Sequence, residues 1–367
     1  MKNKKSKVGI SQRKLIAKRF FRHKLAVISL IVLAVFYIII IFAGFISPFS
    51  ANKRFNRFLY AQPAKIHFIS KDGSFSLTPF IYGNNITVNP VTWERIYSEN
   101  TNEKYYIKFF VKGYEYKFLG IFETNIHLFG TDNKNNPLFI LGTDELGRDL
   151  FSRLVYGGRI TLTIGLIGVV LSLVIGVAIG GISGLLGGIV DNGIQRLIEI
   201  IMSVPTIPLW MALTAALPAY WPMLRIYFGI TVLLSLVGWT SIARVIRGKF
   251  ISLREEDFVL ASRTFGGGHW WIIRKHLVPS FAGYIIVQAT LLVPAMILGE
   301  TTLSFLGLGL RPPAVSWGVL LQDAQSIKTL AMNPWLMLPG VCVIIVVLAF
   351  SFIGDGFRDA LDPYTKS

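Results

Sequence analysis

Six runs of apolar residues divide this 367-residue chain, and each is long enough to cross a bilayer as a helix. About 20 helical residues, rising about 1.5 Å each, span the roughly 30 Å hydrocarbon core. The pattern therefore predicts an all-α polytopic membrane protein with six transmembrane helices. The predicted spans are 25–46, 160–186, 194–217, 226–246, 281–306 and 335–353.

The first and third runs differ from ordinary spans. The first is too long for a signal-peptide core and is not followed by a small-residue cleavage site, so we expect it to remain as an uncleaved helix. The third is the weakest candidate because charged residues and prolines interrupt it, namely Arg196, Glu199, Pro205 and Pro208.

Composition supports a membrane protein. Hydrophobic residues make up 53% of the chain and charged residues 16%, which is too apolar for a soluble chain of this length. The net charge of +17 raises the alternative of nucleic-acid binding. No basic groove interleaved with aromatic residues accompanies that charge, so we expect no nucleic-acid partner. The single cysteine, Cys342, can form no disulfide within the chain.

The positive charges predict the orientation. Ten Lys and Arg residues and no acidic residue occupy 1–24, as expected for a basic cytoplasmic segment. A second basic cluster, which includes Arg244, Arg247 and Lys249, lies at the end of the fourth span and in the loop 247–280. If the spans alternate, both clusters lie inside, both termini are cytoplasmic, and 47–140 lies outside.

The segment 47–140 is far too long for a connector, so we expect a small folded extracytoplasmic domain inserted after the first span. Two β-rich runs, 105–112 and 114–118, surround Gly113 and predict a hairpin that turns at this glycine. The histidines and glutamates of the segment match no metal-site or catalytic-triad spacing. We therefore expect no enzyme activity from it.

The loop 247–280 carries the strongest functional pattern. The small residues Ala261 and Ser262 precede Gly266, and Pro279 ends the segment, which indicates a short helix, a turn and a second short helix. Glycine permits the reversal, and proline stops or kinks the second helix. The charged residues of this pattern are Glu255, Asp257 and Arg274. Such a loop is suited to contact a cytoplasmic partner.

Two further polar or glycine-rich segments flank the spans. Residues 141–149 combine glycines with Asp144, Arg148 and Asp149, and predict a tight polar turn at the outer surface. Residues 304–318 combine glycines and a Pro-Pro pair with Trp317. They indicate either a broken helix packed in protein or an ordinary interfacial loop with a Trp anchor.

Together these segments resemble the inner-membrane permease subunits of ATP-binding-cassette importers, in the oligopeptide, dipeptide and nickel group, and within it the second, C-type subunit. The resemblance covers about 15–48 and 140–363. It rests on KRFFRHKLAVISL (18–30), GTDELGRDLFSR (142–153), SFLGLG to SWG (304–318) and the coupling motif of the cytoplasmic loop. In that motif Ala261 and Ser262 take the two alanine positions, while Leu260 departs from the usual glutamate.

The resemblance implies a permease core, 141–363, that carries no chemistry of its own. ATP and Mg would be bound by two separate cytoplasmic ATPase subunits, in agreement with the absence of a phosphate-loop motif from the sequence. A homologous permease subunit, as a heterodimer, and an extracytoplasmic binding protein would be the other partners, in a bacterial or archaeal cytoplasmic (inner) membrane.

The resemblance also assigns roles to residues. Glu255, Asp257, Ala261, Ser262, Gly266, Arg274 and Pro279 would couple to the ATPases. From their position beside the outer segment, we expect an outer-face gate or binding-protein contact to be formed by Asp144, Arg148, Asp149, Glu300 and Trp317. Peptides are the expected substrate, with nickel complexes or oligosaccharides as alternatives. An alternative of another class is an ion-coupled carrier or channel, for which Glu199 and Glu300 are the candidate ionisable residues.

Overall fold

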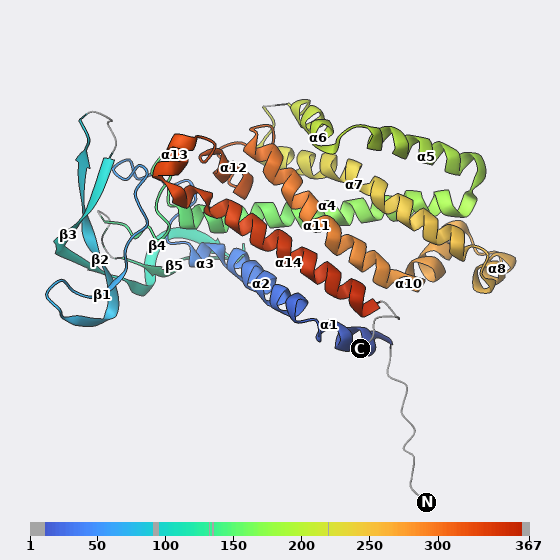
Figure 1. Ribbon diagram of the computed structural model, residues 1–367, viewed down its shortest axis with the longest axis horizontal. Helices are drawn as coiled ribbons and strands as arrows, with labels where there is room; N and C mark the ends of the chain where they lie inside the picture. The colour runs from blue at the N-terminus through green and yellow to red at the C-terminus, as the bar shows by residue number, and fades with distance from the viewer. Residues whose placement is uncertain (1–11, 91–94, 132, 134–135, 219, 362–367) are drawn as a thin grey trace, which may run out of the picture. The chain divides into compact units, whose positions relative to one another are not determined.

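The computed structural model describes residues 12–90, 95–131, 133, 136–218 and 220–361 (Figure 1). Most of the predicted basic segment, 1–11, and the last residues of the predicted core, 362–363, lie outside this part. The chain forms two compact units. One is built around Thr163–Glu300 together with the helices nearest the two termini, and the other joins Val35–Leu162 to Thr301–Val343.

Five helical segments of the described chain are long and apolar enough to cross a membrane. They are α2 (Lys24–Ile41), α4 (Leu150–Leu186), α7 (Met223–Leu253), α11 (Ala282–Phe305) and the segment Pro334–Leu361, made of the 3₁₀ turn η2 (Pro334–Met337) and α14 (Leu338–Leu361). They correspond to five of the six predicted spans. The α4 helix begins ten residues before the predicted start of its span, because the polar residues that precede its apolar run are buried in protein.

The third predicted span is not one straight helix. Helix α5 (Gly188–Ser203) and helix α6 (Thr206–Ala215) meet at a bend of 89°, so 194–217 is either a broken span or a re-entrant segment. Val204 at the break is extended, as the residue before a proline tends to be, and Pro205 has no N–H to continue the helix. The interruption seen in the sequence therefore bends the chain.

Small residues bring two helices of the first unit close together. Gly176, Gly180 and Gly184 recur every four residues on α4 and face α7, where a Cβ on Gly184 would lie 2.9 Å from the Arg247 carbonyl oxygen. This close backbone approach is the packing that small residues permit in membrane helices. An apolar cluster that includes Ile246 and Phe250 continues the contact toward the end of α7.

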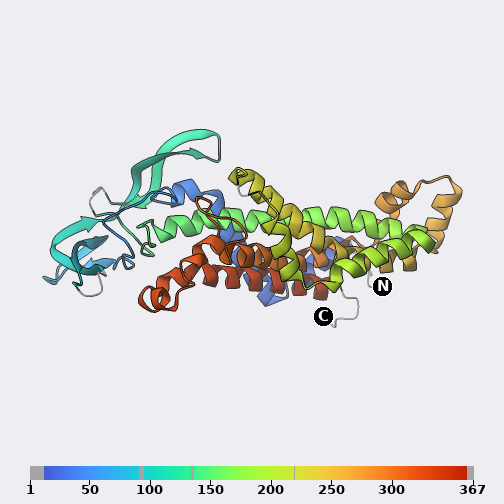
Figure 2. The ribbon, with the colours of Figure 1, turned by 90° about the horizontal axis from the view of Figure 1, so that it is seen from above.

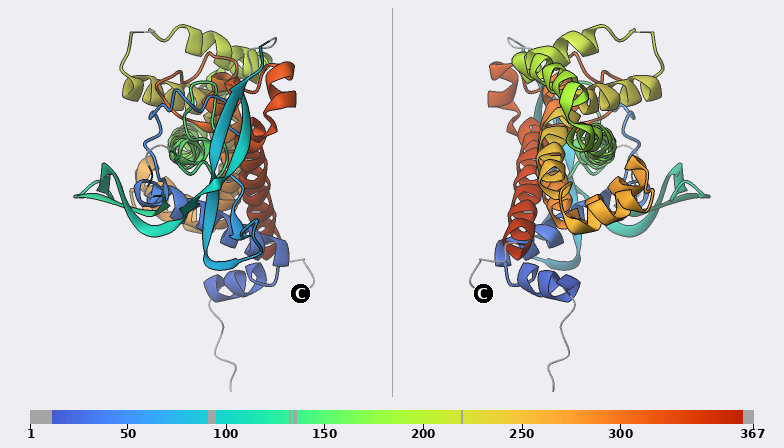
Figure 3. Two further views of the ribbon diagram at one scale, coloured as in Figure 1. Left: turned by 90° about the vertical axis from the view of Figure 1, so that its left-hand side faces the viewer. Right: turned by 90° about the vertical axis from the view of Figure 1, so that its right-hand side faces the viewer.

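Five strands form the polar insertion in the second unit. Strands β1 (His67–Ile69), β2 (Phe75–Val88) and β3 (Arg95–Tyr106) form an antiparallel sheet in that order. Strands β4 (Lys108–Phe118) and β5 (Phe122–Gly130) form a separate antiparallel hairpin, which runs in another direction (Figure 3). The predicted β-containing domain is therefore present as strands.

The hairpin turns at a different place from the one predicted. Gly113 lies inside β4, and the chain reverses at 119–121, between Phe118 and Phe122. Gly113 instead makes room for a histidine ring, since a Cβ there would lie 2.8 Å from His127 Nε2. The prediction failed because a glycine that permits a turn and a glycine that permits close packing look the same in a sequence.

The remaining helices are short. They are α1 (Gln12–Phe20), α3 (Ala43–Ile46), α8 (Asp257–Thr264), α9 (His269–Ile272), the π-helical turn η1 (Ile273–Leu277), α10 (Val278–Ser280), α12 (Trp317–Gln322) and α13 (Ile327–Met332). Most of them lie at the ends of the long helices.

Candidate functional site

The loop between α7 and α11 forms the predicted pair of short helices. Helix α8 ends in a reversal where Gly266 adopts φ +80°, the left-handed region that glycine accepts without strain. The Gly266 N–H donates to the Arg263 carbonyl and the Gly267 N–H to the Ser262 carbonyl, both at 2.9 Å. This pair of bonds is the Schellman arrangement, which satisfies carbonyls at a helix end. The sequence-based prediction of a glycine turn is confirmed.

One side of the loop is fixed in an apolar core. Val259, Ile272 and Leu277 are buried and pack with Phe250 of α7 and Phe281 before α11. This packing holds α8 and α9 in one arrangement. Pro279 does not end the segment as predicted, because it lies within α10 and the helical path continues toward α11.

The other side of the loop is exposed and apolar. Phe265 is 90% exposed, Trp270 60%, Trp271 48% and Leu260 46%. The predicted residues Glu255, Asp257, Ala261, Gly266, Arg274 and Pro279 are exposed as well. A rigid helix pair with several uncovered aromatic rings is a typical docking surface for another protein.

Ser262 differs from the other predicted coupling residues. It is buried, and its hydroxyl donates to the Phe258 carbonyl of its own helix at 2.8 Å. Ala261 beside it is exposed. Of the two small residues, only Ala261 is therefore placed to meet a partner directly.

An ion pair that the sequence analysis did not single out lies near this loop. Arg247 of α7 forms two bonds of 2.5 Å to the carboxylate of Asp191 on α5, and Ser183 of α4 donates to the same carboxylate at 2.5 Å. The group ties three helices together. A signal was available, because Asp191 is the only acidic residue in 150–198. Its partners lie 56 and 8 residues away along the chain, so the spacing did not reveal them.

The polar turn in the second unit is a buried charge cluster. The carboxylate of Asp144 is fully buried and accepts from Arg148 Nε at 2.6 Å and from Arg153 Nη1. The N–H groups of Leu146 and Arg148 donate to its other oxygen, both at 2.9 Å. The turn was predicted at the outer surface, but its charges are inside the protein. Arg153 was missed, although it ends the quoted segment 142–153.

Asp149 is buried beside this cluster. Its Oδ2 accepts from the N–H and the hydroxyl of Ser152, at 2.8 and 2.6 Å, while its Oδ1 has no hydrogen-bond partner in the described part of the chain. Burial raises the pKa of Asp149 to about 7. Burial also raises the pKa of Asp323 to about 6, with the nearby Asp144 carboxylate acting in the same direction.

The turn anchors the start of the inserted segment. The Thr143 N–H donates to the Ala61 carbonyl at 2.9 Å, and the Thr143 hydroxyl donates to the Phe58 carbonyl at 2.6 Å. Gly147, at φ +69°, lies against the Phe55 carbonyl. A cavity of about 430 Å³ next to the turn is lined by the charged residues Arg54, Glu145, Arg148, Arg153 and Asp323, among others.

The segment 304–318 is packed in protein. Trp317 is 1% exposed, its indole N–H donates to the Leu154 carbonyl at 2.9 Å, and its backbone N–H donates to the Thr161 hydroxyl at 3.1 Å. This finding favours the packed alternative over an interfacial Trp anchor. Glu300 is also fully buried. All five residues predicted for the outer face are therefore inaccessible.

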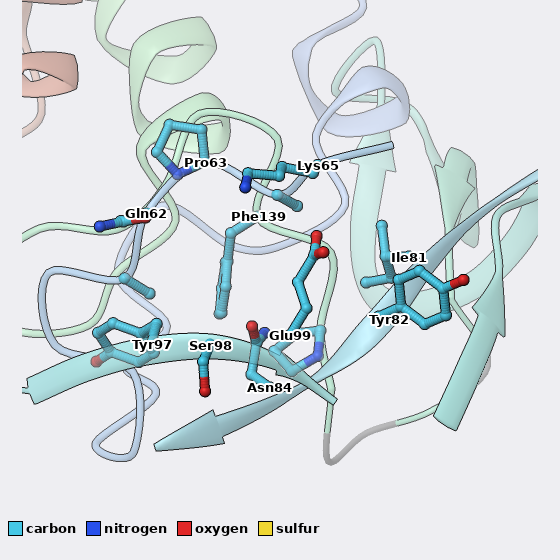
Figure 4. A pocket seen from close by; sticks show the side chains of 13 residues that line it. Gln62, Pro63, Lys65, Ile81, Tyr82, Asn84, Tyr97, Ser98, Glu99 and Phe139 are labelled. Atoms are coloured by element: carbon cyan, nitrogen blue, oxygen red, sulfur yellow. The ribbon is translucent and has the colours of Figure 1, made fainter. Parts of the chain in front are cut away.

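The three-stranded sheet bears another cavity, of about 300 Å³. Figure 4 shows the Phe139 ring within it, with Tyr97, Ser98 and Glu99 of β3 along one side and Gln62 to Lys65 along the other. Glu99 is engaged with His67 Nε2 at 2.9 Å. Within the described residues, no group of three or more His, Cys, Asp or Glu is arranged to hold a metal ion.

Comparison with known proteins identifies the family. Residues 176–367, more than half of the chain, match the profile of the binding-protein-dependent transport system inner membrane component. Residues 11–63 match the N-terminal transmembrane domain of oligopeptide transport permease C. The chain belongs to the binding-protein-dependent permeases. As such it is a transport subunit of the inner membrane and not an enzyme, and the carrier or channel alternative is set aside.

Two relatives with known names and one solved structure are similar to this chain. The permease is 42% identical over 224 residues to the dipeptide transport system permease protein DppC of Bacillus subtilis (strain 168), covering 60% of this chain and 68% of that one. It is 40% identical over 223 residues to the oligopeptide transport system permease protein OppC of the same strain, covering 60% and 70%. In a solved structure, the inward-facing MetNI methionine ABC transporter, one chain aligns with 58% of this chain and 98% of its own length, at 21% identity and a TM-score of 0.42.

A long region between the two family profiles is unmatched. Residues 64–175 lie between them and contain the five strands of the described chain as well as the buried turn at Asp144. The inserted strands therefore distinguish this permease from what the family profiles describe.

Proposed function

We propose that this permease forms half of a translocation path for peptides, paired with a homologous six-span subunit, docked on two cytoplasmic ATPases and supplied by an extracytoplasmic binding protein. The names of the relatives, dipeptide and oligopeptide permease proteins, support the choice of substrate. ATP and Mg are bound by the ATPase subunits in this proposal. Nickel complexes and oligosaccharides become the alternatives to exclude by experiment.

The exposed aromatic side of the α8–α9 loop carries the coupling proposal. Phe265 and Trp270 are uncovered, although the residues behind them are packed in a core. A surface that is apolar and rigid loses little conformational entropy when a partner covers it. Movement of an ATPase against this loop would be transmitted to α7 and α11, because the loop is packed between their ends.

Aspartate substitutions test the coupling role. Phe265→Asp and Ala261→Asp place an unpaired charge in the contact, which costs a few kcal/mol if it is desolvated. Co-purification of the ATPases and peptide uptake should both fall, while the amount of permease in the membrane stays constant. Leu77→Asp is the matched control for ATPase co-purification, since Leu77 is 88% exposed on β2, in the other unit. Normal ATPase binding by both loop variants would refute the proposal.

Transport assays test the substrate separately. Proteoliposomes that hold the whole transporter should take up a radiolabelled dipeptide or oligopeptide when ATP and the binding protein are supplied. Uptake of nickel or of an oligosaccharide in place of the peptide would overturn the peptide assignment. It would leave the permease role intact.

The orientation is part of the proposal, with both termini and the α8–α9 loop in the cytoplasm and the strands outside. In a Cys342→Ala background, a cysteine at Asn100 on β3 should react with a membrane-impermeant thiol reagent added to intact cells. A cysteine at Gly268 should react only after the cells are opened. Labelling of the Gly268 variant from outside would overturn this orientation.

We assign a positioning role to the buried outer-face residues. Asp144, Arg148 and Asp149 are inaccessible, but the turn that contains them anchors 55–61, the start of the inserted segment, through Thr143, Asp144 and Gly147. In this proposal these residues support the surface that the binding protein contacts, but they do not contact the binding protein themselves. Trp317 likewise holds the segment 304–318 in place. The buried Glu300 has a positioning role within α11.

A further inference from the structure

The turn between β4 and β5 consists only of non-polar residues. The sequence there is Phe118-Leu119-Gly120-Ile121-Phe122. Turns are usually made by Gly, Asn, Asp, Ser or Pro, whose backbone preferences or short polar side chains favour a reversal. Leu119 adopts φ +52°, a region that side chains other than those of Asn and Asp rarely enter. Gly120, at φ +77°, is the glycine that such a turn uses, but local turn chemistry does not explain the four apolar residues around it.

The apolar tip is uncovered. Leu119 is 52% exposed, Ile121 72% and Phe122 67%. A Cβ placed on Gly120 would find no atom within 4 Å. A solvated hairpin tip with this composition would be an aggregation hazard. The exposure thus points to a partner of apolar character.

The hairpin is anchored at the end of a membrane-spanning helix. The Phe118 ring lies 5.7 Å from that of Phe42, which directly follows α2. Tyr116 packs on Gly44 of α3, and His127 Nδ1 lies 2.9 Å from the Gly44 carbonyl oxygen. Figure 2 shows the hairpin beside α3 and the start of α4. The tip therefore lies where the first hydrophobic span ends.

The exposed apolar face at the end of α2 points to lipid as the partner of the tip. Val35, Ile38 and Ile41 recur at three-residue intervals before Phe42 and are 48–55% exposed, as expected of side chains that face lipid. If α2 spans the membrane, the tip is thus attached next to a surface that faces lipid. Lys117, behind the tip and 3.9 Å from Glu123, can reach phosphate headgroups.

We propose that the β4–β5 tip, residues 118–122, inserts into the lipid bilayer at the interface beside the end of α2. The bound partner is the membrane lipid, and the hairpin acts as a second anchor for the inserted strands. This inference requires that α2 spans the membrane, but it is independent of the transported substrate.

Spin-label accessibility tests the proposal. In a Cys342→Ala background, a nitroxide at Ile121→Cys is measured in the whole transporter, reconstituted in phosphatidylcholine–phosphatidylglycerol vesicles. Oxygen, which concentrates in lipid, should relax this label more strongly than a water-soluble nickel chelate does. The control label at Leu77→Cys, on an exposed position of β2, should show the reverse order.

Two other results of the spin-label experiment would overturn the proposal. Strong relaxation of the Ile121 label by the chelate, as at Leu77, would place the tip in water and overturn the proposal. An immobilised spectrum with little access to either reagent would overturn it too, by showing that a neighbouring protein covers the tip. Adding Phe122→Asp to the Ile121 label should abolish the preference for oxygen while leaving the Leu77 label unchanged. A preference that survives this substitution would show that the tip is not held by its own apolar side chains.

Discussion

Two charged segments of this permease look alike in the sequence but differ in the structure. Residues 142–153 and 255–279 both combine acidic residues, arginines and glycines next to apolar spans. In the first, Asp144, Arg148 and Arg153 are buried and bonded to one another. In the second, Glu255, Asp257 and Arg274 are exposed. Charges of the first segment hold parts of one chain together, whereas the second segment leaves its surface open to a partner.

The difference has a physical basis. A buried charge is tolerated only where opposite charges and hydrogen-bond donors surround it, and Asp144 has both. An exposed charge needs no partner because water solvates it. The two segments should therefore respond very differently to equivalent substitutions.

The largest effect is expected at Asp144. Asp144→Asn removes the negative charge that two buried guanidinium groups share, and breaking a buried ion pair from one side costs about 3–5 kcal/mol. The purified transporter should unfold at a clearly lower temperature in detergent. Glu145→Gln is the control, because Glu145 is the exposed neighbour. Equal losses for both variants would show that the burial of Asp144 is not what matters.

A smaller effect that depends on pH is expected at Asp149. Its pKa of about 7 lies above the ordinary value of 3.8, so the folded state keeps a proton that the unfolded state releases. The contribution of the protonated Asp149 to the free energy of unfolding is fully present below about pH 4. It is lost as the pH rises through 7. Asp149→Asn, which keeps an acceptor for Ser152, should therefore gain stability relative to the wild type between pH 5 and pH 8, by on the order of 1 kcal/mol or more. Thermal unfolding at a series of pH values measures this gain, and parallel curves for the two proteins would contradict it.

An effect of roughly 1–2 kcal/mol is expected at Gly266. Gly266→Ala places a side chain at φ +80°, which costs roughly 1–2 kcal/mol. Amide hydrogen exchange at Ser262–Gly267 should quicken, and ATPase binding should weaken. Gly268→Ala is the matched control, because Gly268 has φ −70° and open space around it. Faster exchange in the control alone would refute the assigned turn.

The smallest effect is expected at Glu255. Its pair with Arg254, at 3.4 Å, involves side chains that are 77% and 33% exposed, and such pairs contribute about 0–1 kcal/mol. Glu255→Gln should leave the unfolding temperature nearly unchanged. Any loss should appear in ATPase binding and should shrink at high salt. A large loss of stability would mean that this side of the loop is also structural.

Much of the architecture could be predicted from local patterns. Run lengths identified five helices that could span the membrane, and the charged residues and prolines of the third run marked it as the weakest candidate. Gly266 was placed at a reversal because only glycine accepts that backbone easily. These features depend on residues that are close together in the chain.

The errors arose where distant residues meet. Gly113 was taken as a turn, but its role is set by His127 on the neighbouring strand. Ser262 was expected to face a partner, although it is buried on the side of the loop that packs against the apolar core. The pair of Asp191 and Arg247 joins residues 56 positions apart, and no spacing rule reaches that far.

By itself the sequence determined that this chain crosses a membrane, because bilayer thickness imposes a length rule that apolar runs reveal directly. The pattern of the coupling loop, which is local, carried the resemblance to the permeases. Only the tertiary structure decided which charges are buried and which surfaces remain open. A carboxylate such as Asp144 can contact a partner protein or can hold parts of its own chain together. Which of the two it does depends on the arginines and backbone groups that folding brings to it. That environment is a property of packing in three dimensions, and the order of residues states it only indirectly.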